Sequence, residues 1–132
     1  MKLRETHVIN QLMRNCYDKG LHYRTEVPLY RSKIDMVTVN PDNNQVVAIE
    51  AKISNWYRAL QQATSYSMCA DKVYLALWHK FVHRVDVDML DRYGIGLLSV
   101  NGSVDEVKKA KKSKYINNDL ITETRRHVLQ QN

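Results

Sequence analysis

An apolar, strand-forming run at residues 45–53 carries two charged residues near its end, Glu50 and Lys52. Alternate residues of a strand lie on the same face, so Glu50 and Lys52 point one way and Ala51 points the other. The face with the two charges also carries Ala48. Glu50 is therefore expected to be a carboxylate at the end of an otherwise apolar row.

A second predicted strand, residues 33–39, precedes this run and is separated from it by the turn-forming sequence Asn-Pro-Asp-Asn-Asn. If Val39 lies opposite Val46, the antiparallel register places Asp35 opposite Glu50. Directly opposed side chains have Cβ atoms ~5 Å apart, a separation that allows two carboxylates to share one divalent ion. Without a cation the two charges would repel each other. A slip of one residue would reverse the faces.

The other elements follow from apolar periodicity and from turn residues. Ser54 or Asn55 is expected to cap the second helix, and Gly20 and Gly94 to end the first and third. The tail beyond Ser103 carries Lys108, Lys109, Lys111, Lys112 and Lys114 before a last helix. Helices are expected at residues 2–19, 55–70, 86–92 and 119–130, and strands at 22–29, 33–39, 45–53, 72–78 and 95–100.

The first predicted helix carries a further acidic residue, Glu5. It stands three residues before Val8 and seven before Leu12, on the apolar face of the helix. A charge on that face costs free energy unless it finds a partner, and a position above the sheet near the two carboxylates would supply one. Alternatively, the first turn projects beyond the core and Glu5 only favours the helix N-terminus.

Length and composition are those of one globular domain, because 132 residues with 44% hydrophobic and 26% charged side chains can bury a single core. Residues 1–102 are expected to form the core domain and residues 103–132 a basic C-terminal extension packed on it. The 20 Lys and Arg against 14 Asp and Glu give a net charge of +6, which favours a polyanionic partner. No signal-like start or bilayer-spanning apolar stretch is present, so the expected location is the cytoplasm.

Two further sets of residues have an ordinary structural explanation. Cys16 and Cys69 lie among apolar residues of predicted helices, so we expect buried structural thiols rather than a disulfide. His79 and His83 are four residues apart and can face together on a helix. A zinc site would need further ligands, and the cysteines lie far away in sequence.

The succession Ile34-Asp35, a turn, the strand ending in Glu50-Ala51-Lys52, and a helix resembles the core motif of the PD-(D/E)XK nucleases. An isolated Glu-x-Lys means little, but here the upstream Asp and the leading acidic helix stand in family order. The resemblance covers about residues 1–80, and Ile34 replaces the proline of the family name at a position that varies. It implies a restriction-endonuclease-like α/β fold, with an αβββαβ core and a mixed central sheet flanked by helices.

The second predicted helix adds Gln62 and Tyr66, which resemble the Gln-x-x-x-Tyr motif of recombination-associated exonucleases. Residues four apart share a helix face. The resemblance implies that the two side chains position the phosphate or Lys52. An ordinary polar pair on a half-exposed helix is the alternative.

The resemblance also implies a set of metal ligands. Asp35, Glu50 and the backbone carbonyl of Ala51 would bind Mg²⁺ or Mn²⁺, ions that prefer oxygen ligands. Lys52 would orient the attacking water or help to deprotonate it, and would stabilise the charge of the transition state. Glu5 would hold a second metal or a water bound to it.

These residues predict a divalent-metal-dependent DNA phosphodiesterase of endonuclease or resolvase type. Similar resolvases act as homodimers on branched DNA, so a homodimer is one expectation, and the structure of the DNA substrate stays open. A catalytically inactive DNA-binding or structural module on the same fold is the alternative. A protein-interaction domain is a third, in which Asp35 and Glu50 would be exposed and far apart.

Several residues are candidates for contact with nucleic acid. Arg31, Lys33 and Arg58 flank the proposed site in sequence and can reach DNA phosphates, although a solvated surface role explains them nearly as well. The lysine-rich residues 108–114 can follow a nucleic-acid backbone or simply form a soluble tail. Three aromatic residues can stack on bases or belong to the core: Trp56, Tyr57 and Trp78.

Overall fold

The computed structural model describes residues 2–130, so residue 1 and residues 131–132 of the expected extension lie outside the described part. The αβββαβ core is confirmed. In chain order the elements are α1 (Glu5–Asp18), β1 (His22–Leu29), β2 (Ser32–Val39), β3 (Val46–Lys52), α2 (Trp56–Ala63), the 3₁₀ helix η1 (Thr64–Met68), β4 (Lys72–Trp78), the 3₁₀ helix η2 (His79–Arg84), α3 (Val87–Tyr93), β5 (Gly96–Val100), β6 (Val104–Lys108) and α4 (Asn118–Leu129).

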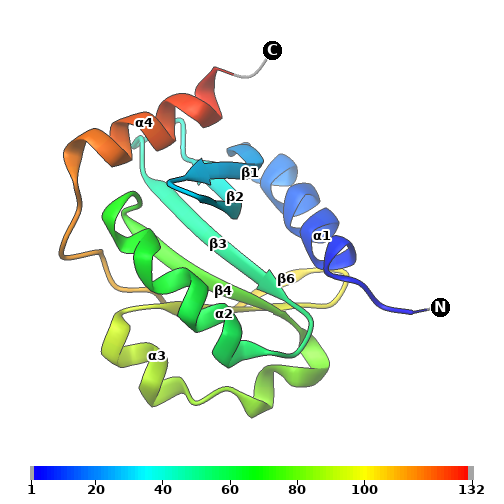
Figure 1. The fold of residues 1–132 in the computed structure, drawn as a ribbon. Helices are drawn as coiled ribbons and strands as arrows, with labels where there is room; N and C mark the ends of the chain where they lie inside the picture. Colours follow the sequence, from blue (N-terminus) through cyan, green and yellow to red (C-terminus); the bar gives the residue numbers. More distant parts are fainter. Residues whose placement is uncertain (1, 131–132) are drawn as a thin grey trace.

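The six strands form one mixed sheet in the order β1-β2-β3-β4-β5-β6 (Figure 1). β1, β2 and β3 are an antiparallel meander, β3, β4 and β5 are parallel, and β6 runs antiparallel to β5. Parallel neighbours need a crossover, which α2 and α3 supply. The predicted α/β class with a mixed sheet flanked by helices is confirmed.

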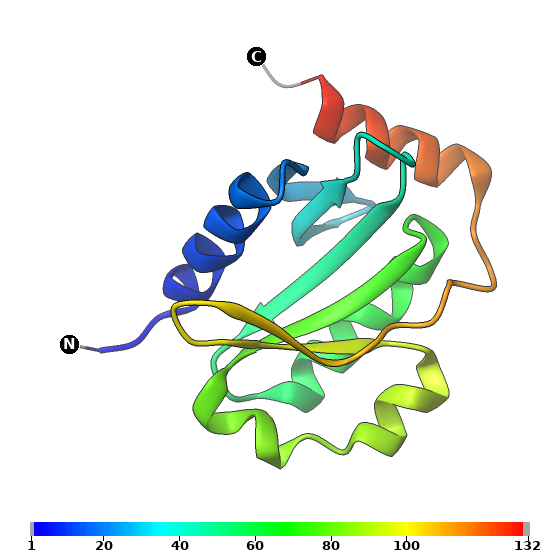
Figure 2. The same ribbon diagram turned by 180° about the vertical axis from the view of Figure 1, so that it is seen from behind.

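Helices cover the two faces of the sheet, with α1 and α2 on opposite sides (Figures 1 and 2). Val8, Leu12 and Cys16 recur every four residues along α1 and are buried, which confirms the predicted apolar face. Cys16 and Cys69 are both buried and form no disulfide. Burial raises the pKa of Cys16 to about 11, so this thiol is inert at neutral pH.

The β1–β2 hairpin changes face partway along. Tyr23 packs on the α1 side of the sheet, whereas Val27 and Leu29 join the core under α2. Residues four apart in a regular strand share a face, so the alternation is interrupted between them. Glu26 lies at the interruption with a φ of +53°, a conformation that is unfavourable for a residue with a side chain.

A strand that the sequence analysis does not include follows Ser103, because Val104–Lys108 form strand β6. The strand lies at the edge of the sheet, and Asp105 and Glu106 in its middle are exposed, so it lacks the apolar alternation of a buried strand. Pairing with β5 after the turn at Gly102 places it in the sheet. Farther on, α4 packs on β1 and β2.

The second helix also differs from its prediction, because the α-helical part ends at Ala63 and continues as η1. The hydroxyls of Thr64, Ser65 and Ser67 each donate to the carbonyl three residues earlier. Such bonds compete with the regular helix, and the 3₁₀ pitch is tighter. The expected cap is confirmed at Asn55, whose side chain accepts from a backbone N–H. Within residues 2–130 every helix is too short or too polar to cross a bilayer.

Candidate active site

The register predicted from the turn at residues 40–44 is confirmed, and β2 and β3 pair as far as Met36 opposite Ile49. Beyond this point β2 continues beside β1, and β3 continues beside β4. The two strands thus separate into a fork, which we define by Asp35 on the β2 arm and Glu50 on the β3 arm.

Asp35 is half-buried and is attached to the opposite arm of the fork. Its Oδ2 accepts a hydrogen bond of 2.8 Å from the backbone N–H of Ala51. The Ala51 N–H lies just past the last paired residues of β2 and β3, and this hydrogen bond satisfies it. The bond also holds the Asp35 carboxylate against β3, next to Glu50.

Glu50 is the buried acid of the site, with an exposed fraction of only 3%. Burial raises the pKa of Glu50 to about 7; the hydrogen bond from Tyr66 and the charge of Lys52 act in the opposite direction, whereas Asp35 adds to the rise. Asp35 does so through its negative charge and by accepting a hydrogen bond from the protonated Glu50 carboxyl. The two carboxyls are therefore neighbours, as expected, and are not exposed and far apart, the arrangement expected for a protein-interaction domain.

Tyr66 is buried beneath η1, and its hydroxyl donates to Glu50 Oε1 at 2.6 Å. Burial and the contact with Glu50 hold the pKa of Tyr66 above its usual range, so the hydroxyl keeps its proton and acts as a donor. The side chain thus contacts Glu50; the role that the motif implies, positioning the phosphate or Lys52, stays a prediction.

Gln62 lies on α2, one turn before Tyr66. Its side-chain oxygen, Oε1, is buried and has no hydrogen-bond partner among residues 2–130. A buried acceptor without a donor costs about 1–3 kcal/mol. Such an atom is satisfied when a water or a bound group supplies a donor.

Lys52 ends β3 and meets Glu5 at the margin of the sheet. Its Nζ lies 3.7 Å from Glu5 Oε1, with side-chain exposures of 20% for Lys52 and 51% for Glu5. Within residues 2–130, Glu5 forms no metal-binding group of three acids with Asp35 and Glu50, and its role toward a second metal stays a prediction. The exposed first turn of α1 fits the alternative that it projects beyond the core. A pair this exposed contributes little to stability.

The donor chemistry at the fork fits Mg²⁺ or Mn²⁺. Asp35, Glu50 and the Ala51 carbonyl are oxygen donors, the ligands that both ions prefer. Among residues 2–130 no group of three or more Asp, Glu, His or Cys side chains is arranged to hold a metal, which also leaves His79 and His83 without further ligands. Additional ligands at the fork would be water and substrate oxygens, as is usual for Mg²⁺.

The basic residues predicted to contact DNA are all exposed. Arg31 lies in the β1–β2 turn, Lys33 lies near the start of β2, the strand that carries Asp35, and Arg58 lies in the first turn of α2. Of the aromatic candidates, Trp56 and Trp78 pack against the core, whereas Tyr57 is 51% exposed.

No protein-family model and no curated protein matches the sequence. Among solved structures, the chain is similar to SPO1766, a protein of unknown function from Silicibacter pomeroyi, with a TM-score of 0.73 and 19% identity. The match covers 98% of this chain and 84% of SPO1766. The two proteins share a fold. At this identity the likeness says nothing of activity.

Two further structures are more distant. A repair endonuclease from Pyrococcus abyssi has a TM-score of 0.49 and 15% identity, over 84% of this chain and 48% of the endonuclease. SfsA from Pyrococcus furiosus, solved in complex with Ca²⁺, has a TM-score of 0.45 and 9% identity, over 80% of this chain and 64% of SfsA. Similarities of this size do not establish a common fold.

Proposed function

We propose that the protein is a divalent-metal-dependent nuclease that hydrolyses DNA phosphodiester bonds at the fork between β2 and β3. The observation that carries the proposal is the neighbouring pair of carboxyls, Asp35 and Glu50, with the pKa of Glu50 raised to about 7. A fold that holds two acids together in a confined space gains stability from a cation that neutralises both. The oxygen donor set and Lys52 beside it are what metal-assisted phosphodiester hydrolysis requires.

Asp35, Glu50 and the carbonyl of Ala51 would hold the ion. When bound, it supplies polarisation of the scissile phosphate. Glu50 must be ionised to act as a ligand, so protons and metal ions compete for it. Metal affinity therefore rises with pH until the pH exceeds the pKa of about 7.

Lys52 is the cationic donor that the chain itself provides. It ends β3 two residues after Glu50, and its charge already acts on Glu50 by lowering the pKa of that carboxyl. Its ammonium would orient the attacking water and donate to phosphate oxygens as negative charge develops in the transition state. The exposed contact with Glu5 leaves this ammonium free to turn toward a substrate.

Tyr66, Gln62 and the Ala51 N–H are positioning groups in this proposal. The Tyr66 hydroxyl and the Ala51 amide each hold one carboxylate in place, at 2.6 Å and 2.8 Å. The unpaired Gln62 oxygen would accept a hydrogen bond from a water in the site. Arg31, Lys33 and Arg58 would contact the DNA backbone outside the fork. A homodimer stays a prediction, which the molar mass in solution tests.

The test is incubation of the purified protein with labelled linear, flap and four-way-junction DNA in Mg²⁺ or Mn²⁺. Glu50→Ala and Lys52→Ala should each reduce cleavage at least 100-fold, the size expected for loss of a group that stabilises the transition state. The matched controls are Asp42→Asn, in the exposed turn at the other end of β2 and β3, and Lys19→Ala, exposed at the end of α1. Equal cleavage by wild type and both fork variants would rule out the assignment. DNA binding without cleavage by any form would favour the inactive module.

A further inference from the structure

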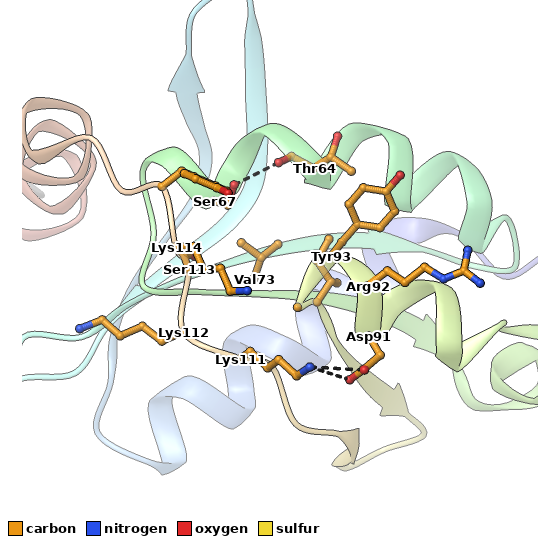
Figure 3. A pocket seen from close by; sticks show the side chains of 13 residues that line it. Thr64, Ser67, Val73, Asp91, Arg92, Tyr93, Lys111, Lys112, Ser113 and Lys114 are labelled. Carbon is orange, nitrogen blue, oxygen red and sulfur yellow. Dashed lines mark hydrogen bonds and ion pairs between the residues drawn. The ribbon is translucent and has the colours of Figure 1, made fainter.

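A cavity of about 600 Å³ lies outside the fork, between η1, α3 and residues 111–115 (Figure 3). A second cavity of about 390 Å³ adjoins it along the outer side of α2 and ends at Tyr57. The two cavities share Thr64, Arg92 and Tyr93. We call this continuous feature the α2–α3 groove.

The groove is positively charged. Its acid, Asp91, is neutralised by Lys108 and Lys111, with Nζ to carboxylate distances of 2.8 Å and 3.3 Å. Hydrogen bonds from these lysines hold the pKa of Asp91 below its usual range. The other cations of the groove, Arg92, Lys112 and Lys114, make no ion pair with any residue in the described part of the chain. Their charges are free to meet an anion.

Three exposed tyrosines line the same groove as these cations. Tyr57 is 51%, Tyr93 58% and Tyr115 79% exposed, so none of the three belongs to the core. In Figure 3, Tyr93 extends from α3 toward Thr64, while Arg92 and Lys112 extend in opposite directions. A single exposed aromatic residue is ordinary, but three along one cationic groove form a surface suited to stacking.

We propose that the α2–α3 groove binds single-stranded nucleic acid, with bases against the tyrosines and phosphates against the cations. Aromatic platforms in a basic groove are how proteins bind unpaired strands, because unpaired bases expose their faces. In a duplex those faces are stacked on one another, and exposed tyrosines would gain little. Duplex binding is therefore the outcome that contradicts the proposal.

The position of the groove links it to the fork. Tyr57 to Thr64 spans seven residues of helix, or about 10 Å along α2. Tyr57 and Arg58 lie in the first turn of this helix, only five and six residues after Lys52. A nucleic-acid strand bound in the groove would lead toward the carboxyl end of β3. The inference that this strand is the substrate rests on the proposed nuclease function. The inference that the groove binds single strands does not.

The experiment measures fluorescence anisotropy of labelled 15-nucleotide oligomers of DNA and RNA and of the matched DNA duplex. It uses Glu50→Gln protein without divalent metal, so that cleavage plays no part. We expect single strands of one or both chemistries to bind at least 10-fold more tightly than duplex, with affinity falling as salt rises. The DNA and RNA arms decide which strand is preferred.

Two groove variants carry the assignment, each made in the Glu50→Gln protein and checked by thermal unfolding. Tyr57→Ala/Tyr93→Ala/Tyr115→Ala should weaken binding at least 10-fold, and Lys112→Ala/Lys114→Ala should weaken it and reduce its salt dependence. The control is Tyr17→Ala, a tyrosine 78% exposed on α1. Unchanged binding by both groove variants, or equal binding of duplex, would overturn the proposal. Cleavage failure by wild type, with groove binding intact, would overturn only the nuclease function.

Discussion

The fork and the α2–α3 groove share η1, which supplies Tyr66 to one and Thr64 to the other, yet they are built in opposite ways. At the fork, a few largely buried groups contact one another in a chain that runs from the Ala51 amide through Asp35 and Glu50 to Tyr66. In the groove, exposed side chains stand in solvent. Interdependent buried groups should respond strongly and non-additively to substitution, whereas separate exposed groups should respond weakly and additively.

Asp35→Asn should give the largest effect. It removes one of two negative metal ligands, so we expect cleavage to fall by about 1,000-fold and Mn²⁺ binding to weaken strongly. Cleavage rates and titration calorimetry measure the two effects, with Asp42→Asn as control. If the variant binds Mn²⁺ as wild type does, the fork is not the metal site.

Lys52→Ala should come next and should separate catalysis from metal binding. The variant keeps all three proposed metal ligands but loses the ammonium, so cleavage should fall about 100-fold to 1,000-fold while Mn²⁺ affinity is unchanged or higher. Lys19→Ala serves as control. A parallel loss of metal binding would show that Lys52 acts on the fold of the site and not on the reaction.

Glu50→Gln should impair cleavage and yet stabilise the metal-free protein at pH 8. The folded-state pKa of Glu50, about 7, lies above the usual 4.5, so the folded state holds this proton more tightly than the unfolded state. The stabilising effect of protonation is complete below pH 4.5 and is lost as the pH rises through 7. We expect the variant to gain about 1–3 kcal/mol over wild type at pH 8 and nothing at pH 4.5.

Thermal unfolding at the two pH values checks this prediction. Added Mn²⁺ should raise the Tm of wild type at pH 8 and leave Glu50→Gln nearly unchanged. A wild-type protein more stable than Glu50→Gln at pH 8 without metal would contradict the view that the carboxylate pair is unfavourable on its own.

Tyr66→Phe should have a smaller effect. The Tyr66 hydroxyl lowers the pKa of Glu50, so its removal should move the acid limb of the pH–activity profile to higher pH. At pH 7 we expect cleavage to fall about 10-fold, with recovery near pH 9, because one hydrogen bond to a charged group contributes ~1.5–3 kcal/mol. A loss that is the same at every pH would indicate a structural role instead.

Arg92→Ala in the groove should give the smallest effect. One exposed cation contributes weakly, so the affinity for a single-stranded oligomer should fall only about 2-fold to 5-fold, and less at high salt. Anisotropy titrations at two salt concentrations measure this. A loss as large as that of Asp35→Asn at the fork would abolish the contrast between the two regions.

Much of this architecture could be predicted from the sequence because short-range rules determine it. The bounds of β1 and β4 agree with the prediction to the residue. The pairing of β2 with β3 followed from one turn, and it was enough to bring Asp35 and Glu50 together. A hairpin fixes its register locally, so no knowledge of the rest of the fold was needed.

The features that escaped prediction depend on tertiary placement. The periodicity of α1 identified its buried face but not which side of the sheet it covers, so the contact of Glu5 with Lys52 could not be derived from it. The 3₁₀ helix η1 and the hydrogen bond from its Tyr66 to Glu50 also depend on the tertiary structure. The α2–α3 groove combines Tyr57, Tyr93 and Tyr115 from three distant segments, so no sequence window contains it.

The separation of β2 from β3 after Met36 and Ile49 has a consequence for protein engineering. Extending the β2–β3 hydrogen bonds across the fork would make the sheet more regular. It would also pair the backbone groups of Ala51 with β2 and so displace the Asp35 carboxylate. Selection for stability alone would therefore act against the carboxyl pair of the fork. A thermostable version that keeps this pair should be sought in the apolar core of the α1 face, at residues such as Val8 and Leu12, which contribute no group to the fork.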